Sequence, residues 1–169
     1  PYRSRSGRGS MSISVPTLIL VTTIVTFTTS ILLAISWQQN PSERCLFYWS
    51  AANLVGTIAA LLFGQRGLGL DFLTIHCANI ALFISSGFAW GGMREFARQK
   101  FPLYVVAIAP ALWILLSVAT PFDASMVART IFSSSVVAVF AFGGAFELWR
   151  HKSERLMSRY PAIVVCGVH

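Results

Sequence analysis

Residues 15–37, VPTLILVTTIVTFTTSILLAISW, form an unbroken stretch of 23 residues without a charged side chain. An α-helix rises about 1.5 Å per residue and the hydrocarbon core of a bilayer is about 30 Å thick, so roughly 20 apolar residues can cross it. The stretch therefore predicts a transmembrane helix. A secretory signal peptide is the alternative, with Arg3, Arg5 and Arg8 as its charged region and AIS at 34–36 as its cleavage site. The run is longer than the usual core of about 7 to 15 residues and more apolar runs follow, which disfavours that alternative.

The later apolar runs are separated by clusters of charged residues. Four of them are long enough to cross a bilayer, and the last one covers only about 15 Å. We therefore expect an all-α fold, a polytopic membrane helix bundle with five complete transmembrane helices and a truncated sixth. The expected spans are 15–37, 45–64, 70–93, 101–120, 126–149 and the truncated 160–169.

The composition of the chain agrees with a lipid environment. Hydrophobic residues make up 55% of it and charged residues 11%, and the mean hydropathy is +0.66. Soluble domains carry about 25% charged residues. The chain begins with Pro1, while Met11 stands just before the first apolar run. We interpret Met11 as the natural start, 1–10 as a disordered or non-native extension, and 11–169 as the transmembrane helical domain.

The positive charges predict how the helices are oriented. Of the five segments that follow the five expected spans, the first, third and fifth together hold eight Lys and Arg, and the second and fourth at most two. Because positively charged segments stay in the cytoplasm, we expect the odd segments inside and the N-terminus outside. Tryptophans at helix ends should anchor the same face in the headgroups. The expected cytoplasmic-face anchors are Trp37, Trp49, Trp90, Trp149, Arg94, Arg98, Lys100, Arg150 and Lys152.

Small residues form ridges on the third expected span. Gly87 and Gly91 make a G-x-x-x-G pair, and a second ridge has small residues at every fourth position. A phosphate-binding loop would need a different glycine spacing, which is not present. Small residues allow close approach of another helix in lipid, so we expect these ridges to pack, with a homodimer as one outcome. The second ridge is Cys77, Ala81, Ser85 and Ala89.

Polar side chains inside spans are costly in lipid and are candidates for function. Asp71, His76 and Asn79 share the third span, and Arg129 lies near the start of the fifth. Together they form a candidate intramembrane site that responds to protons or a ligand at the outer face. The structural alternative is that the asparagines, Asn53 included, bond neighbouring helices, Asp71 caps its helix and Arg129 extends to the interface.

Several other functions find no support in the sequence. The basic residues are spread over segments that flank the spans, so they form no nucleic-acid surface. Cys45, Cys77 and Cys166 belong to three different runs, and no metal-ligand spacing occurs. The sequence shows no nucleophile beside a base and no carboxylate pair, so we expect no catalytic residue, no metal and no cofactor in this chain.

One long stretch resembles a known family. Residues 56–99 read GTIAALLFGQRGLGLDFLTIHCANIALFISSGFAWGGMREFARQ and end in W-x-G-x-R-x-F, formed by Trp90, Gly92, Arg94 and Phe96. With FDASMVART at 122–130 and the basic segment 150–159, this order resembles the multi-span N-terminal region of bacterial diguanylate cyclases that carry a C-terminal GGDEF domain.

The resemblance implies a bacterial inner-membrane protein and a role in cyclic di-GMP signalling. In that family a cytoplasmic domain joins two GTP molecules with Mg²⁺ as a dimer. The 169 residues contain no GGDEF motif, so GTP and Mg²⁺ would belong to a missing C-terminal output domain. What the resemblance implies for this chain is a membrane anchor and sensory input region. With the N-terminus outside, a cytoplasmic domain can follow only an odd number of spans, so the charge pattern predicts seven spans if such a domain follows.

A small transporter or channel is the alternative function. The intramembrane polar residues would then line a pathway, and an internal repeat or broken helices would be expected. Pro110 is the only proline deep within a span, and no repeat between the halves is evident.

Overall fold

The computed structural model describes residues 15–65, 71–120 and 125–150, and these ranges are helical apart from short connections. The all-α prediction is confirmed for these ranges, where no strand occurs. The expected extension 1–10, the truncated run 160–169, Cys166 and Lys152 lie outside the described residues. The helices are α1 (Val15–Gln39), α2 (Arg44–Gly64), α3 (Asp71–Phe96), α4 (Val105–Ala119) and α5 (Met126–Arg150).

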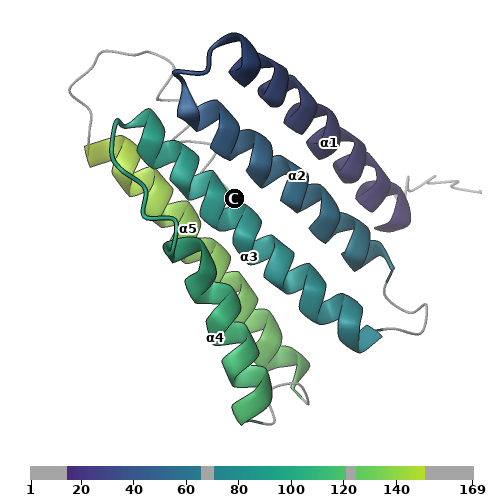
Figure 1. Ribbon diagram of the computed structural model, residues 1–169. Helices are drawn as coiled ribbons and strands as arrows, with labels where there is room; N and C mark the ends of the chain where they lie inside the picture. Colours follow the sequence, from purple (N-terminus) through teal and green to yellow (C-terminus); the bar gives the residue numbers. More distant parts are fainter. Residues whose placement is uncertain (1–14, 66–70, 121–124, 151–169) are drawn as a thin grey trace, which may run out of the picture.

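Helix α3 is the centre of the bundle (Figure 1). It packs against α2, α4 and α5, whereas α1 packs against α2 at the edge of the bundle. In Figure 1, α1, α2 and α3 lie side by side, and α4 and α5 cover the remaining side of α3. A compact apolar core joins α3, α4 and α5, and consists of Phe83, Ala109, Trp113 and Phe140.

Large apolar side chains cover the outside of the bundle. Leu20 on α1 is 60% exposed, Val118 on α4 is 82% exposed, and Phe142 on α5 is 69% exposed. Soluble monomers rarely expose so much contiguous apolar surface. Helices α1, α2 and α5 are also long and apolar enough to cross a membrane, by length and composition. These features are compatible with a helical membrane protein.

Five complete spans, as expected from the sequence, are not confirmed, because α3 and α4 are not among these three helices. Helix α3 has 26 residues, but it carries His76, Asn79, Arg94 and Glu95. Its neighbours α2, α4 and α5 surround it, so its polar groups can face protein rather than lipid. The helix that carries these polar and charged residues therefore lies at the centre of the bundle.

Helix α4 is shorter than the predicted span 101–120. It has 15 residues, about 22 Å, and begins at Val105. Residues 97–104 run back along the bundle before the helix starts (Figure 1). Pro102 lacks a backbone N–H and its fixed φ suits a turn or the first turn of a helix. Its carbonyl accepts a hydrogen bond from the Val105 N–H at 3.1 Å, which leads into α4.

The C-terminal end of α3 is a Schellman motif. The Gln99 N–H donates to the Arg94 carbonyl and the Arg98 N–H to the Glu95 carbonyl, both at 2.9 Å. Arg98 takes the left-handed conformation, with φ of 59°. Glycine is the usual residue at this position because a Cβ atom is strained there.

Hydroxyl groups join α1 to α2. Ser30 Oγ donates to the Ser50 carbonyl and Ser50 Oγ donates to the Ser30 carbonyl, each at 2.9 Å. Four residues before Ser30 and seven after Ser50, the Thr26 and Thr57 hydroxyls lie 2.9 Å apart. Such bonds satisfy hydroxyls in a surface that is otherwise apolar, and they fix α1 against α2.

Candidate functional site

His76 on α3 contacts Trp113 on α4. The Trp113 Nε1–H donates a hydrogen bond to His76 Nδ1 at 2.9 Å, and the two ring centroids lie 5.9 Å apart. Trp113 is fully buried and also packs edge-on against Phe83. Because the indole N–H can only donate, His76 Nδ1 is the acceptor in this bond, and that nitrogen atom carries no hydrogen. Sequence reasoning missed the pair, although Trp113 was the one tryptophan away from a helix end.

Asn79, one turn further along α3, contacts α5. The Ser133 hydroxyl donates to Asn79 Oδ1 at 2.8 Å, and Asn79 Nδ2 donates to the Ile75 carbonyl at 2.8 Å. Asn79 is 5% exposed, so both bonds are shielded from solvent. The sequence indicated that Asn79 would bond a neighbouring helix as one alternative, but did not identify Ser133 as the partner.

Arg129 lies one turn before Ser133 on α5 and shares a cavity with Asn79. The cavity has a volume of about 390 Å³. Its lining comes from α2, α3 and α5 and consists of Phe63, Ile75, Asn79, Leu82, Met126, Arg129, Thr130, Ser133 and Ser134. His76 is not part of this lining, and the side chain of Asp71 lies outside the described part of the chain. The structure thus brings Asn79 and Arg129 together and directs His76 to Trp113.

A second set of contacts joins α3 to α5 near the other end of both helices. Arg94 Nε lies 3.6 Å from Glu147 Oε1, and the Arg94 guanidinium lies over the Trp90 ring, 5.7 Å from its centroid. Glu95, which follows Arg94, faces away toward α2. Arg94 therefore pairs with a residue on α5 and not with the adjacent Glu95.

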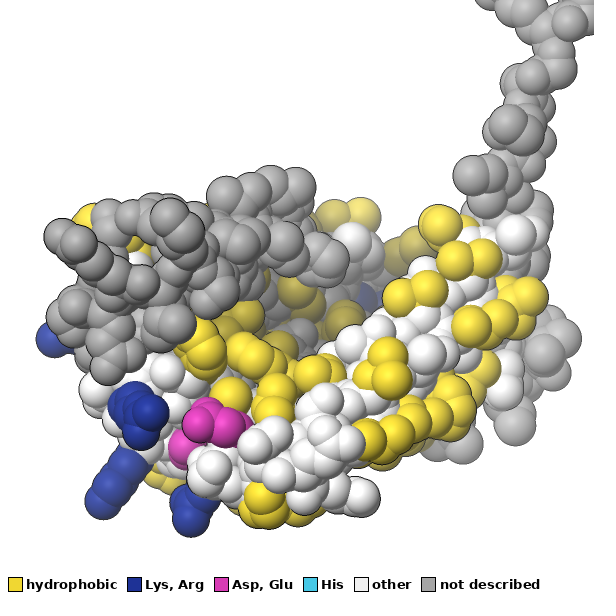
Figure 2. Space-filling view, turned by 90° about the horizontal axis from the view of Figure 1, so that it is seen from above, with side chains coloured by type: hydrophobic (Ala, Val, Ile, Leu, Met, Phe, Trp, Pro, Cys, Tyr) yellow, Lys and Arg dark blue, Asp and Glu magenta, His cyan; other side chains and the backbone are white. Residues whose placement is uncertain are grey.

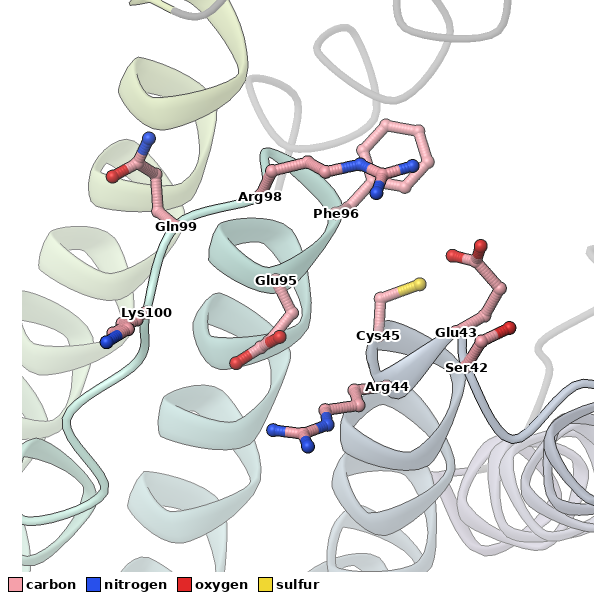
Figure 3. Close-up of a pocket in the computed structure, with 9 residues that line it drawn as sticks. All are labelled: Ser42, Glu43, Arg44, Cys45, Glu95, Phe96, Arg98, Gln99 and Lys100. Atoms are coloured by element: carbon pink, nitrogen blue, oxygen red, sulfur yellow. The ribbon is translucent and has the colours of Figure 1, made fainter.

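The basic residues of the first and third segments meet at this end. Arg44, Glu95, Arg98 and Lys100 line a mixed-charge pocket of about 480 Å³, and Figure 3 shows the Arg44 and Glu95 side chains extending toward one another. Figure 2 shows Lys and Arg side chains gathered beside acidic ones at one corner, and many apolar side chains elsewhere on the described surface in this view. The sequence predicted that these segments share an end of the bundle.

The glycines of the G-x-x-x-G pair pack inside the chain. A Cβ atom at Gly91 would lie 2.7 Å from the Phe101 ring, and one at Gly87 would lie 3.2 Å from Val106 Cα. Both glycines are buried. They make room for the segment that returns from α3 and for the first turn of α4. This face is therefore covered within the chain and offers no surface for a homodimer through Gly87 and Gly91.

The second small-residue ridge packs partly against α2. Ser85 Oγ donates to the Ala52 carbonyl at 2.8 Å, and a Cβ atom at Gly56 would lie 3.1 Å from Ser85 Oγ. Ala81 is buried, whereas Cys77 is exposed. The ridge supports α3 against its neighbour over Ala81 and Ser85.

The tryptophans expected to anchor one membrane face have different environments. Trp49 packs over Gly92 of α3, and Trp90 lies against Phe101 and Phe140. Trp149 is 61% exposed. Trp49 and Trp90 thus contribute to helix packing, and Trp149 is free to contact the surroundings.

The described residues contain no group of three or more His, Cys, Asp or Glu side chains placed to hold a metal ion. Comparisons of the chain with protein-family models, with curated proteins and with solved structures find no match. The fold and the apolar surface indicate a helical membrane protein. Polar residues lie between the central helix and the helices around it.

Proposed function

We propose that the chain is a membrane anchor and sensory input region of a bacterial cyclic di-GMP signalling protein whose output domain is cytoplasmic. In this proposal it is a multi-pass protein of the inner membrane, α1 to α5 all cross the bilayer, and the N-terminus is outside. GTP and Mg²⁺ act in the output domain and not in the residues of this chain.

The observation that carries the proposal is the double connection between α3 and α5. Asn79 bonds Ser133 near one end, and Arg94 pairs with Glu147 near the other. The two contacts are separated by 15 residues on α3 and 14 on α5, which corresponds to about 22 Å and 21 Å of helix. A displacement at Asn79 would reach Glu147 through two packed, rigid helices, and α5 ends beside the basic segment that begins at Arg150.

The charge distribution supports the proposed orientation. Arg44, Arg94, Arg98 and Lys100 lie at one end of the bundle, which the positive-inside rule assigns to the cytoplasm. The polar residues His76, Asn79 and Arg129 then occupy the half of the bundle nearer the exterior, where an external signal could act.

We retain the homodimer that the family resemblance implies, but we propose a different contact surface for it. Because Gly87 and Gly91 contact the chain's own Phe101 and Val106, we place the dimer contact on an exposed apolar face of α1, α4 or α5.

A small transporter is the second candidate, and the cavity at Asn79 and Arg129 is the observation that favours it. A transporter would move a solute through this cavity, whereas an input region would bind it without flux. Uptake into proteoliposomes that depends on Arg129 would establish the second candidate.

The proposal is tested by sequencing the gene downstream of the codon for His169. We expect an in-frame continuation that encodes a GGDEF domain, and we expect the complete protein to convert GTP into cyclic di-GMP when Mg²⁺ is present. A reading frame that continues into another kind of domain, or that stops without one, contradicts the cyclic di-GMP assignment.

A further inference from the structure

The cavity beside Asn79 combines a guanidinium group with an apolar wall. Arg129, Asn79 and Ser134 contribute polar groups, and Phe63, Leu82 and other apolar residues form the remaining surface. Thr130 and Ser134 are exposed, so the cavity reaches the surface of the bundle. A cavity of about 390 Å³ is within the range of small-ligand sites.

Arg129 is partly buried, and one nitrogen of its guanidinium lacks a hydrogen-bond acceptor among the described residues. That atom is Nε, and it is buried. None of the described residues that line the cavity carries a negative charge. A buried guanidinium nitrogen without an acceptor is unfavourable, so an anion in the cavity would supply the acceptor that the described residues do not.

The start of α5 adds to the positive potential. Ser125 caps this helix, because its Oγ accepts a hydrogen bond from the Ala128 N–H at 3.2 Å. Arg129 follows in the first turn, where the helix dipole is positive and a basic side chain is not stabilised by it. The position of Arg129 thus strengthens attraction for an anion without adding to helix stability.

A second donor is available on the opposite wall. Asn79 Nδ2 carries two hydrogens and uses one for the Ile75 carbonyl. The other Nδ2 hydrogen, on α3, and the guanidinium N–H groups of Arg129, on α5, are two sets of donors that can bind two oxygens of one oxyanion. The apolar residues around them suit an oxyanion attached to a hydrocarbon group.

We propose that this cavity binds a phosphate oxyanion, with Arg129 as the main binding residue and Asn79 as the second donor. The phosphate can belong to the headgroup of an anionic lipid or to a soluble phosphate, and the two sources are distinguished by experiment. The inference does not depend on the signalling role, because binding is measured on the membrane chain itself.

The test uses the full chain purified in detergent. Phosphatidylglycerol binding is measured by native mass spectrometry, and inorganic phosphate binding by isothermal titration calorimetry. We expect saturable binding of one of the two probes, which identifies the source. The substitution Arg129→Gln should weaken this binding at least tenfold. The control Arg150→Gln removes one positive charge from the exposed end of the same helix and should leave the affinity within twofold of the original.

A second variant keeps the test decisive if Arg129→Gln does not fold, as judged by circular dichroism. Ser134→Leu fills part of the cavity from an exposed position, leaves Arg129 in place, and should also weaken binding at least tenfold. The proposal is overturned if the unmodified chain binds neither probe, if folded Arg129→Gln and Ser134→Leu bind as well as it does, or if Arg150→Gln loses as much affinity as Arg129→Gln.

Discussion

The Ser133 hydroxyl on α5 donates a 2.8 Å hydrogen bond to Asn79 Oδ1 on α3, and this bond is partly buried between the two helices. It orients the Asn79 amide, so that Nδ2 faces the Ile75 carbonyl of its own helix. One side chain on the central helix is thereby held by its own backbone and by a neighbouring helix. This arrangement connects the cavity to the contact between α3 and α5.

The strength of this bond can be measured by a double-mutant cycle on Asn79→Ala and Ser133→Ala. Hydrogen bonds between membrane helices contribute about 0.6 kcal/mol on average, and we expect a coupling energy of about that size. Unfolding in mixed detergent, followed by circular dichroism, gives the free energies. Ser134→Ala, an exposed neighbour on α5, is the matched control and should change stability by less than about 0.5 kcal/mol. A coupling energy of zero would contradict the role of this bond in joining α3 to α5.

Trp113 should stabilise the bundle more by packing than by its hydrogen bond to His76. Trp113→Phe removes the donor but keeps an aromatic ring against Phe83, and we expect a loss of about 1 kcal/mol in the free energy of unfolding. Trp113→Ala also leaves a cavity in the core and should cost about 3 to 5 kcal/mol. Equal losses for the two variants would show that the ring contacts contribute little.

Gly87 on α3 and Gly143 on α5 provide a matched pair for testing close packing between α3 and its neighbours. A Cβ atom at Gly87 would lie 3.2 Å from the backbone of Val106, whereas at Gly143 the nearest atoms, in Trp90, are 3.5 Å away. Gly87→Ala must displace α4 and should destabilise the chain by about 1 to 3 kcal/mol. Gly143→Ala should be neutral or stabilising by up to about 1 kcal/mol, because alanine favours helix. Thermal unfolding in detergent measures both, and a tolerated Gly87→Ala would contradict the close approach of α4.

The sequence predicts more of the fold than of the candidate site, and the reason is physical. Long uncharged runs define helices by their length alone, which is why α1, α2 and α5 match the apolar runs closely. The start of α4 at Val105 could not be read from the uncharged run, because 101–104 contain no charged residue that would interrupt it. Only Pro102 signalled the turn.

The partners in the candidate site depend on which faces of the helices meet. A helix that is apolar on every side carries no periodic signal for its packing face. The polarity of His76, Asn79 and Arg129 marked them as candidates, but Ser133 and Trp113 resemble ordinary residues of an apolar helix. The same limit explains why the G-x-x-x-G pair predicted close packing without showing that α4 of the same chain is the neighbour.

The end of α3 offers a stabilising substitution. Arg98 has a φ of 59°, in the left-handed region where a Cβ atom is strained. Arg98→Gly should raise the free energy of unfolding by about 1 kcal/mol, because it relieves this strain within the Schellman motif. Arg98→Ala is the control, since it removes the charge and keeps the Cβ atom. If Arg98→Ala stabilises as much as Arg98→Gly, the gain comes from charge and not from backbone conformation.

Whether α3 crosses the membrane can be decided by labelling its two ends. Gln65 follows α2 at one end of the bundle and Lys100 follows α3 at the other, so cysteines introduced at these positions report on opposite faces. The native Cys45, Cys77 and Cys166 are first replaced by alanine. In intact bacterial cells, a membrane-impermeant maleimide should label Gln65→Cys and should label Lys100→Cys only after the cells are opened, because the basic end is expected in the cytoplasm. Labelling of both positions from outside would show that α3 does not cross. The reverse pattern would retain the crossing and invert the proposed orientation, which would place the cavity at Arg129 on the cytoplasmic side.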